Sequence, residues 1–379
     1  MKRYIFLGLI LILFLLPSSV YAVSLAPSAA SAVLIDGNNG RILYEKNAHE
    51  KRAPASTTKI MTACLAIELG NLDDIVTVSA NAAKVGGSSM YLSPNEKVKF
   101  EHLLYGVMLN SGNDASTALA EHIARSSSDF AKKMTEKAIE IGALNTQFKN
   151  PHGLDQDGHY STAYDLAIIT KYAMENPIFR NIVKTKVKNV PWEGRDYERV
   201  LRNKNKLLDE FPGANGVKTG FTNNAGRCLV SSAERNGQHL IAVVLNCSNM
   251  WEDSKSLLQY GFDNFKPYTL VQKNQIVKTI PVEEGTKNEL KVIASDNLTI
   301  SLSSEEITKI TPPLLELPDQ ISAPIVKGQP LGYAKVIYEG KQLGKVSLIA
   351  AEDIEQQSYI TSIKNSIFNW LINLVKFFE

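Results

Sequence analysis

Apolar and polar positions follow a strand-like period at both ends of residues 23–265 and a helix-like period between them. Residues 32–46 predict a hairpin, because two apolar runs flank a turn of Asp, Gly and Asn residues at 36–40. Strands at both ends with helices between them predict an α/β domain of the α+β kind. We expect its antiparallel sheet to be flanked by helices and to pair the first strand with the last. Helices are predicted over 56–69, 129–141, 162–175 and, as two helices broken at 110–113, over 100–125; strands are predicted over 216–221, 227–233 and 239–246.

Residues 266–357 have a different pattern. Apolar and polar residues alternate in short runs separated by turn residues, for example at 275–280 and 335–338. This pattern predicts a small all-β sandwich domain. We find no nucleophile beside a base within it, so we interpret the domain as a spacer or a binding module.

The last segment, 358–379, has the pattern of an amphipathic helix. Lys364 and Lys376 lie on its polar face, and no acidic residue occurs between Ser358 and Phe378. This composition predicts a helix that lies in a membrane interface, with its lysines facing anionic head groups. The alternative is a helix that packs on its own protein, but the aromatic residues near the end of the chain favour the membrane surface. The apolar face comprises Ile360, Ile363, Ile367, Trp370, Leu371, Leu374, Val375 and Phe378.

The first segment, 1–22, predicts a secretory signal peptide. Lys2 and Arg3 precede a short apolar run. Val20 and Ala22 then place small residues at the positions that a signal peptidase recognises, so we expect cleavage after Ala22. An uncleaved membrane anchor is the alternative, but the apolar run is short for a span. We therefore expect an exported protein on the outer face of the cytoplasmic membrane, held peripherally by the segment 358–379.

Composition excludes several classes of protein. The chain has 379 residues, of which 44% are hydrophobic and 21% charged, as in globular proteins. A formal net charge of +2 argues against binding nucleic acid through overall charge. Cys64, Cys228 and Cys247 are too few for a disulfide scaffold and too scattered for a structural zinc site. We predict three buried thiols, with a Cys228–Cys247 pair as the alternative, and we expect neither a metal nor an organic cofactor.

Ser56 and Lys59 form the first candidate catalytic motif, and this is the only S-x-x-K in the chain. Residues at i and i+3 share one face of a helix. A serine hydroxyl needs a base, and a lysine can be that base when burial or a nearby cation lowers its pKa. A serine at a helix N-terminus also faces backbone N–H groups that stabilise negative charge. Alone, the motif is better explained by a capping serine beside a surface lysine.

Two further motifs follow along the chain. Ser111 and Asn113 stand in a polar turn between apolar helical runs, where a second hydroxyl could relay a proton and an amide could hold a substrate amide. The only K-T-G begins at Lys218, in a predicted strand. Lys218 could anchor a carboxylate and lower the pKa of a nearby Lys59, and the glycine would let a substrate backbone approach. Taken singly, these motifs are explained by a capping loop and an exposed strand lysine.

The three motifs together, in this order, are the signature set of penicillin-binding proteins and serine β-lactamases. The chain resembles the low-molecular-mass penicillin-binding proteins that are serine-type D-alanyl-D-alanine carboxypeptidases. The resemblance covers nearly all of residues 23–379, the distal β domain and the amphipathic tail included. It implies a D,D-peptidase/β-lactamase-like catalytic domain and a part in cell-wall biogenesis and cell shape. The segments that carry it are 54–62, 110–115, 150–155 and 216–222.

The resemblance also assigns roles to residues. It implies that Ser56 is the acylated nucleophile, Lys59 the general base and Ser111 a proton shuttle. Phe221 departs from family members that carry His at that position, a change that a backbone donor tolerates. We interpret His152 as structural, because the serine–lysine pair already supplies a base. The residues implied to meet the substrate are Asn113, Lys218, Thr219, Gly220 and Phe221, the last providing the oxyanion hole together with the backbone N–H of Ser56.

The implied function is removal of the terminal D-alanine from peptidoglycan stem pentapeptides, with β-lactam antibiotics as covalent inhibitors. A D,D-endopeptidase would use the same acylation site. A β-lactamase would also use it, but the Glu-x-x-x-Asn pattern of some β-lactamases does not occur between Ser111 and Lys218. A non-catalytic cell-wall scaffold is a third hypothesis, and the intact motif residues argue against it.

Overall fold

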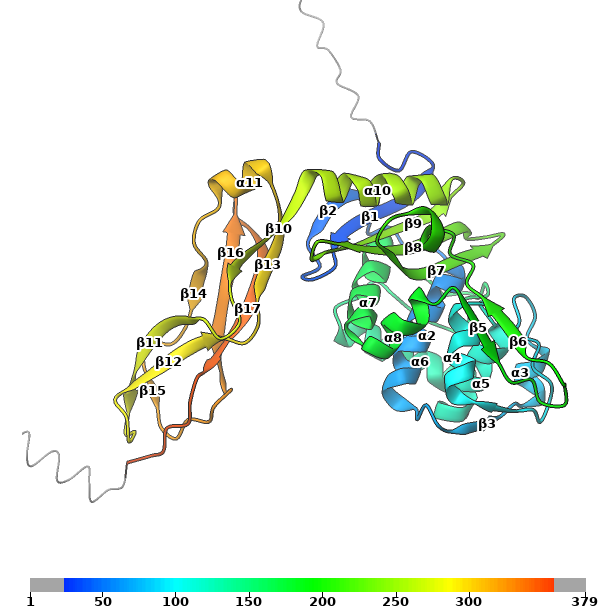
Figure 1. Ribbon diagram of the computed structural model, residues 1–379, viewed down its shortest axis with the longest axis horizontal. Helices are drawn as coiled ribbons and strands as arrows, with labels where there is room; N and C mark the ends of the chain where they lie inside the picture. Colours follow the sequence, from blue (N-terminus) through cyan, green and yellow to red (C-terminus); the bar gives the residue numbers. More distant parts are fainter. Residues whose placement is uncertain (1–23, 358–379) are drawn as a thin grey trace, which may run out of the picture.

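The computed structural model describes residues 24–357, which form two domains (Figure 1). The predicted signal peptide and the predicted interfacial helix at 358–379 lie outside the described residues. Between residues 24 and 357, no helix combines the length and the apolar character that crossing a bilayer requires.

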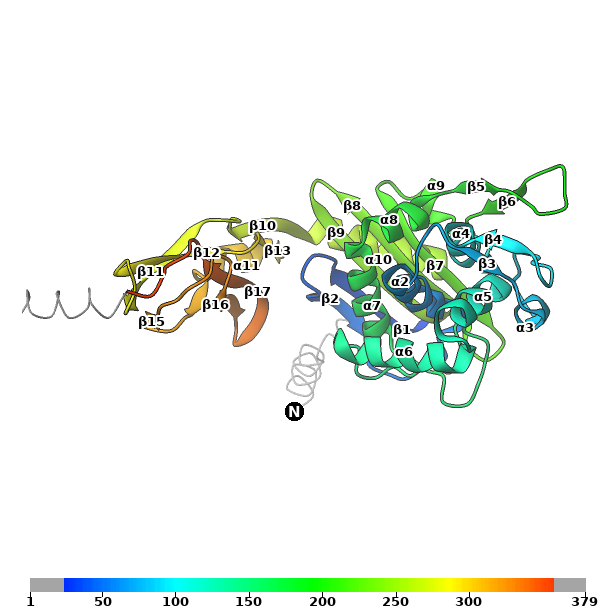
Figure 2. The same cartoon turned by 90° about the horizontal axis from the view of Figure 1, so that it is seen from below.

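A five-stranded antiparallel sheet forms the centre of the first domain (Figure 2). Its strands are β1 (Ala29–Asp36), β2 (Ile42–Lys46), β7 (Ala214–Thr222), β8 (Gly226–Arg235) and β9 (Gln238–Cys247). The strand order is β2-β1-β9-β8-β7, so the first strand pairs with the last of the domain, as predicted. In this pairing Ala32 lies opposite Val244.

Helices cover both faces of this sheet. On one face, Leu34 of β1 packs in a cluster with Leu257 of α10 (Met250–Asn264). On the other face, Val33 and Ile35 belong to the larger core formed with α2 (Lys59–Leu69) and α7 (Ala163–Glu175). Because both faces are buried, these strands are continuous apolar runs in the sequence rather than alternating ones.

The predicted helices are present, with one local difference. The predicted helix over 56–69 begins as a 3-10 turn, η1 (Ala55–Thr58), and becomes α-helical only at α2. The predicted pair over 100–125 is α4 (Phe100–Met108) and α5 (Asn113–Ala124). The remaining helices of this domain are α3 (Ala80–Lys84), α6 (Ser127–Glu140), α8 (Pro177–Lys184) and α9 (Leu207–Glu210).

Two small two-stranded antiparallel sheets lie on the helical side of the domain. They are formed by β3 (Ile75–Thr77) with β4 (Lys97–Lys99) and by β5 (Val187–Val190) with β6 (Arg199–Arg202). Neither pair was predicted, and the sequence of the β5–β6 hairpin is mostly polar. Arg199 anchors this hairpin through a buried ion pair with Glu96, at 2.9 Å, and its guanidinium lies 4.4 Å from the ring centre of Trp192.

The second domain consists almost entirely of strands, as predicted. A six-stranded sheet has the order β14-β16-β17-β12-β11-β15, and β10 pairs with β13 in a two-stranded sheet. Ile300, Val292 and Leu348 are fully buried between these strands. The elements are β10 (Phe265–Val271), β11 (Ile276–Glu283), β12 (Glu289–Ala294), β13 (Leu298–Ser303), α11 (Ser304–Lys309), β14 (Leu314–Glu316), β15 (Ile321–Ser322), β16 (Pro330–Tyr338) and β17 (Lys341–Ala350).

Polar contacts join the two domains where the β1–β2 hairpin meets β13. The backbone N–H of Ser301 donates to Asp36 Oδ2 at 2.8 Å, and Gln238 Nε2 lies 3.3 Å from Ser301 Oγ. Arg41 donates to the Ser301 carbonyl oxygen and forms an ion pair with Glu306 of α11. These contacts hold the second domain against one edge of the first.

All three cysteines are buried free thiols, as predicted. Cys228 lies on β8 and Cys247 on β9, and the two do not form a disulfide.

Candidate active site

Ser56 lies in the turn η1, directly before helix α2. The backbone N–H and the hydroxyl of Thr57 both donate to the carbonyl oxygen of Pro54, at 3.2 and 2.6 Å. Ala55 has a φ of 48°, in the left-handed region that strains a residue other than glycine. This sharp turn places a half-buried Ser56 hydroxyl one helical turn before Lys59.

The side-chain amine of Lys59 is fully buried and has three polar neighbours. Lys59 Nζ lies 3.1 Å from Ser56 Oγ, 2.7 Å from Asn113 Oδ1 and 2.6 Å from the carbonyl oxygen of His152. A neutral amine has two N–H bonds and one lone pair. The amide and carbonyl oxygens accept hydrogen bonds only, so they take the two N–H bonds and leave the lone pair facing the Ser56 hydroxyl.

The electrostatic surroundings favour the neutral form of this lysine. Burial is the main cause that lowers the pKa of Lys59 well below its usual value, because the charged form loses its hydration. The positive charges of Lys218 and Lys204 lower this pKa further, and the carboxylate of Asp114 opposes them. The proposed effect of Lys218 on Lys59 is therefore present, and Lys204 adds to it.

The loop between α4 and α5 brings Ser111 and Asn113 to the lysine. Both side chains are buried, and Ser111 has a φ of 62°. Asn113 Nδ2 donates to the carbonyl oxygen of Gly86 at 2.6 Å, so both polar atoms of this side chain have partners. In this structure Asn113 therefore positions Lys59, whereas Ser111 is not among the three groups within hydrogen-bonding distance of Lys59 Nζ.

Asp114 fixes the segment 86–92 against this loop. Its buried carboxylate accepts hydrogen bonds from the backbone N–H groups of Met90, at 2.9 Å, and Leu92, at 3.1 Å, and from Ser89 Oγ, at 2.6 Å. These contacts surround a negative charge with donors, which offsets the cost of burying it. The segment 86–92, which also holds Asn113, is thus tied to helix α5.

The K-T-G sequence lies on a strand, β7, as predicted, and β7 is at the edge of the sheet. Lys218 is buried, and its Nζ donates to the carbonyl oxygen of Thr219 at 3.0 Å. Burial, followed by the charge of Lys204, lowers the pKa of Lys218 to about 7. Lys218 is therefore poised between its charged and neutral forms at neutral pH.

Gly220 allows β7 to approach η1 (Ala55–Thr58), the turn that carries Ser56, which we call the nucleophile turn. A Cβ at this position would lie 3.1 Å from both the backbone nitrogen of Ser56 and the Cβ of Ala55, which is tighter than ordinary packing. The next residue, Phe221, is 62% exposed, so its ring is not buried in the site. Ser56 and the end of β7 are thus adjacent, as an oxyanion hole shared between them would require.

The imidazole of His152 is not placed to act as a base. Burial, and then the charge of Lys59, lower its pKa to about 3, and its Nδ1 accepts a hydrogen bond from the backbone N–H of Leu154 at 3.3 Å. The carbonyl oxygen of His152, not its ring, contacts Lys59. This arrangement supports the structural interpretation of His152.

Three residues near the site were missed by the sequence analysis. Lys204, whose Nζ lies 3.1 Å from Ser88 Oγ, lowers the pKa of two site lysines. Asp114 directly follows the S-x-N motif, and this position was its only sequence signal. His159 contacts the nucleophile turn from a distant part of the chain, and no local pattern marked it.

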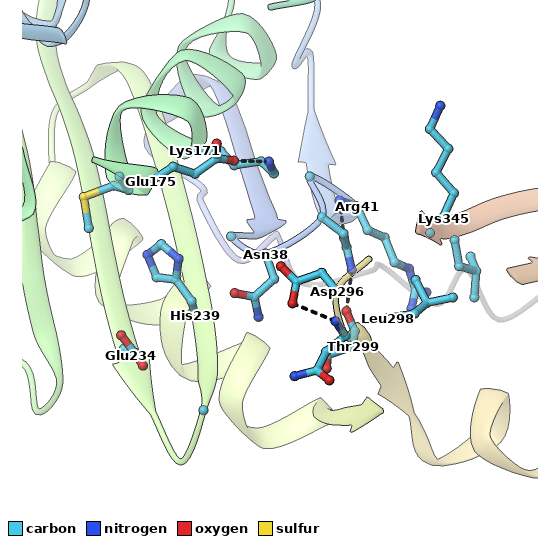
Figure 3. A pocket seen from close by; sticks show the side chains of 18 of the residues that line it. Asn38, Arg41, Lys171, Glu175, Glu234, His239, Asp296, Leu298, Thr299 and Lys345 are labelled. Atoms are coloured by element: carbon cyan, nitrogen blue, oxygen red, sulfur yellow. Dashed lines mark hydrogen bonds and ion pairs between the residues drawn. The ribbon is translucent and has the colours of Figure 1, made fainter. Parts of the chain in front are cut away.

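A polar cleft of about 1150 Å³ lies elsewhere, between the two domains (Figure 3). It is lined by the β1–β2 hairpin, the start of β13 and the charged side chains of Lys171 and Glu175, which pair at 2.8 Å. None of the motif residues lines it. The cleft is therefore separate from the candidate active site.

The antiparallel sheet is flanked by helices, a serine lies beside a buried lysine, and the K-T-G sequence is on the edge strand. These features together are those of a serine hydrolase that works through an acyl-enzyme. Comparison with known proteins specifies the family. Residues 19–249 match the D-alanyl-D-alanine carboxypeptidase family, peptidase S11, and residues 265–356 match the C-terminal domain of penicillin-binding protein 5. The protein belongs to the D-alanyl-D-alanine carboxypeptidase family, as the sequence resemblance implied.

Individual relatives align over most of their length. The chain is 38% identical over 354 residues to the D-alanyl-D-alanine carboxypeptidase DacF of Bacillus subtilis, with 91% of each chain covered. It is 32% identical over 372 residues to DacC of Escherichia coli, covering 93% of this chain and 90% of the relative. The crystal structure of penicillin binding protein 5 from Haemophilus influenzae matches with a TM-score of 0.73 at 32% identity, covering 87% of this chain and 98% of that one. These matches confirm the predicted fold class and enzyme class.

Proposed function

We propose that the protein removes the terminal D-alanine from peptidoglycan stem pentapeptides through an acyl-enzyme on Ser56, and that β-lactams acylate the same serine. One observation carries this proposal: the buried amine of Lys59 lies 3.1 Å from Ser56 Oγ, with its other two contacts made to oxygen acceptors. Membership of the carboxypeptidase family supports the substrate class.

Acylation begins when the neutral Lys59 amine takes the proton of the Ser56 hydroxyl. The serine oxygen attacks the carbonyl carbon of the bond between the two D-alanines, and the negative oxygen that forms accepts hydrogen bonds from the backbone N–H groups of Ser56 and Phe221. The C–N bond then breaks, and the proton passes to the amine of the leaving D-alanine, with Ser111 as the relay. The shortened peptide remains as an ester on Ser56.

Deacylation repeats these steps with water. Lys59, neutral again, accepts a proton from a water molecule that attacks the ester carbonyl carbon. The C–O bond to Ser56 breaks, and the serine oxygen regains a proton. The products are the peptide shortened by one residue and the free enzyme.

Lys218 and Thr219 hold the terminal carboxylate of the substrate in this proposal. Because the pKa of Lys218 is about 7 in the free protein, an arriving carboxylate favours its charged form. Substrate binding therefore fixes the positive charge of Lys218 at the site.

The direct test is D-alanine release from a stem pentapeptide, measured with the wild-type protein and with Ser56→Ala. We expect release from the wild type and none from the variant, because no other described hydroxyl lies in the same position against Lys59. Covalent labelling of the wild type by a fluorescent penicillin serves as a second readout. Release that persists in Ser56→Ala would remove Ser56 from the mechanism.

A second part of the proposal concerns location. We propose that residues 1–22 direct export and that the segment 358–379 anchors the protein to the outer face of the cytoplasmic membrane. The described chain ends at residue 357 on the second domain, at the end remote from the first (Figure 1). A membrane-bound tail would therefore hold the catalytic domain away from the lipid surface.

Deletion of 358–379 tests the anchor. We expect the shortened protein to move from the membrane fraction to the soluble fraction with its penicillin labelling unchanged, since the described site lies wholly in the first domain. Sedimentation of the shortened protein with membranes would contradict the anchor without affecting the proposed chemistry.

A further inference from the structure

The segment 148–160 connects the two halves of the active site. On one side, Thr62 Oγ1 of helix α2 donates to the carbonyl oxygen of Pro151 at 2.6 Å. On the other side, Thr222 Oγ1 of β7 donates to Asp155 Oδ1 at 2.8 Å. One loop therefore contacts both the helix that carries the base and the strand that carries K-T-G.

Gly153 brings this segment directly against the nucleophile turn. Its φ is 84°, and a Cβ at this position would collide with the carbonyl oxygen of Ala55. The hydroxyl of Thr58 would also lie within 2.9 Å of that Cβ. The backbone of the segment thus packs against η1 without an intervening side chain, and a displacement of one moves the other.

His159 is the side chain that joins the end of the segment to the nucleophile turn. It is 7% exposed, and its Nε2 lies 2.9 Å from Thr58 Oγ1. Its Nδ1 accepts a hydrogen bond from the backbone N–H of Lys149 at 3.1 Å, so the ring proton of the neutral imidazole is on Nε2 and is donated to Thr58. The ring of Phe148 packs edge-on at 5.8 Å between ring centres.

The carbonyl oxygen of His152, in the middle of the same segment, orients the base. It lies 2.6 Å from Lys59 Nζ, and together with Asn113 Oδ1 it takes the two N–H bonds of the neutral amine. If this oxygen moves away, an N–H bond of Lys59 becomes free to turn toward Ser56 in place of the lone pair. A small displacement of the segment is therefore sufficient to misdirect the base.

We propose that His159 is a positioning residue for acylation, which holds the His152 carbonyl oxygen at Lys59 by bonding Lys149 at one end of the segment and Thr58 in the nucleophile turn. This inference rests on the proposed role of Lys59 as the base. His159 touches neither the substrate nor the reacting atoms. Its effect is on the direction of the Lys59 lone pair.

The test compares His159→Gln with His159→Phe. Glutamine can accept from Lys149 through its oxygen and donate to Thr58 through its amide, whereas phenylalanine fills the space and makes neither bond. Stopped-flow acylation by a fluorescent penicillin separates the dissociation constant of the non-covalent complex from the acylation rate. We expect His159→Phe to lower the acylation rate about 100-fold with little change in the dissociation constant, as misplacement of a catalytic group by about 1 Å does. We expect His159→Gln to restore the rate to within about threefold of the wild type.

Two further variants keep the proposal testable. Thr58→Val removes the hydroxyl that accepts the bond from His159 and keeps the branched shape of the side chain. We expect it to lower the acylation rate as His159→Phe does, so it replaces that variant if His159→Phe does not fold. His239→Phe replaces a half-buried histidine, bonded to Ser232 at 2.7 Å and away from the site, and should leave the rate unchanged.

Wild-type acylation rates in both His159→Phe and Thr58→Val would overturn the proposal, as would equal losses in His159→Gln and His159→Phe. An equal loss in His239→Phe would also overturn it, since the effect would then be general destabilisation. A wild-type protein that is not acylated at all would contradict the proposed function instead.

Discussion

Replacing Asp114 with asparagine changes one charge inside the site without changing its shape. The carboxylate is buried, and its oxygens accept hydrogen bonds from the backbone N–H groups of Met90 and Leu92 and from the hydroxyl of Ser89. In Asp114→Asn, one oxygen becomes an NH₂ group. If that group replaces Oδ2, it faces the N–H of Leu92, and two donors oppose each other.

The magnitude follows from these bonds. A buried N–H left without an acceptor costs about 1–3 kcal/mol, and each bond that loses its charged partner weakens by about 1 kcal/mol. We therefore expect Asp114→Asn to lower the free energy of unfolding of the catalytic domain by about 3 kcal/mol. For a domain of this size, that corresponds to a fall in melting temperature of roughly 10 °C.

The same substitution also has an electrostatic effect, which is on the pKa of Lys59 rather than on stability. The charge of Asp114 raises the pKa of Lys59, so its removal lowers that pKa further. Because acylation needs neutral Lys59, the acid limb of the pH–rate profile should move to lower pH. Calorimetric melting and penicillin acylation between pH 4 and pH 9 measure the two effects on one preparation.

Asp129→Asn is the matched control. Asp129 is also in the first turn of a helix, α6, but it is exposed and bonds to Ser126 and Lys132 at the surface. We expect its melting temperature and its pH–rate profile to stay near those of the wild type. A melting temperature of Asp114→Asn equal to that of Asp129→Asn, or an acid limb displaced to higher pH, would refute this account of Asp114.

Three other predictions concern charge and pH. Lys59→Arg keeps the positive charge but loses the accessible neutral form, so penicillin acylation should fall by about 10²–10⁴-fold; a near-normal rate would exclude Lys59 as the base. Lys204→Met removes a charge that lowers the pKa of Lys59 and Lys218, so the acid limb of acylation should move to higher pH, and an unchanged limb would mean that Lys204 is electrostatically silent. Burial holds the pKa of His159 at about 4, below its usual 6.5, so the unfolded chain binds a proton that the folded chain does not. The stability that His159 contributes is therefore complete above pH 6.5 and falls by about 3 kcal/mol as the pH falls toward 4. Urea unfolding across this range should show that the wild type loses more stability than His159→Gln does.

Much of the architecture could be predicted because it depends on local patterns. Continuous apolar runs identified β8 and β9, and the Gly and Asn residues at 36–40 identified the first hairpin. The pairing of β1 with β9 followed from their positions at the two ends of the domain. The S-x-x-K spacing placed Ser56 beside Lys59 because both lie within one helical turn.

The remainder depends on contacts between distant parts of the chain. The β5–β6 hairpin is mostly polar and is held by the Arg199–Glu96 ion pair, so it has no alternating hydrophobic pattern from which it could be predicted. Thr58 and His159 are separated by 101 positions, and only the folded loop 148–160 brings them together. The turn at Ser56 is a 3-10 turn that packs closely against Gly153 and Gly220 of β7, and a helical sequence pattern reveals neither its geometry nor these contacts.

The junction between the domains has a consequence for how the two parts can vary. Asp36 and Asn39 of the β1–β2 hairpin bond the backbone N–H of Ser301 and the backbone carbonyl oxygen of Thr299, and Arg41 bonds the carbonyl oxygen of Ser301. Backbone groups are the same whatever side chains β13 carries. These three contacts therefore need no particular side chain on β13, whereas the Arg41–Glu306 ion pair and the bond from Gln238 to the Ser301 hydroxyl do depend on side chains of the second domain. The strand β13 can therefore change most of its side chains without loss of these contacts, as long as Ser301 and Glu306 of α11 are kept.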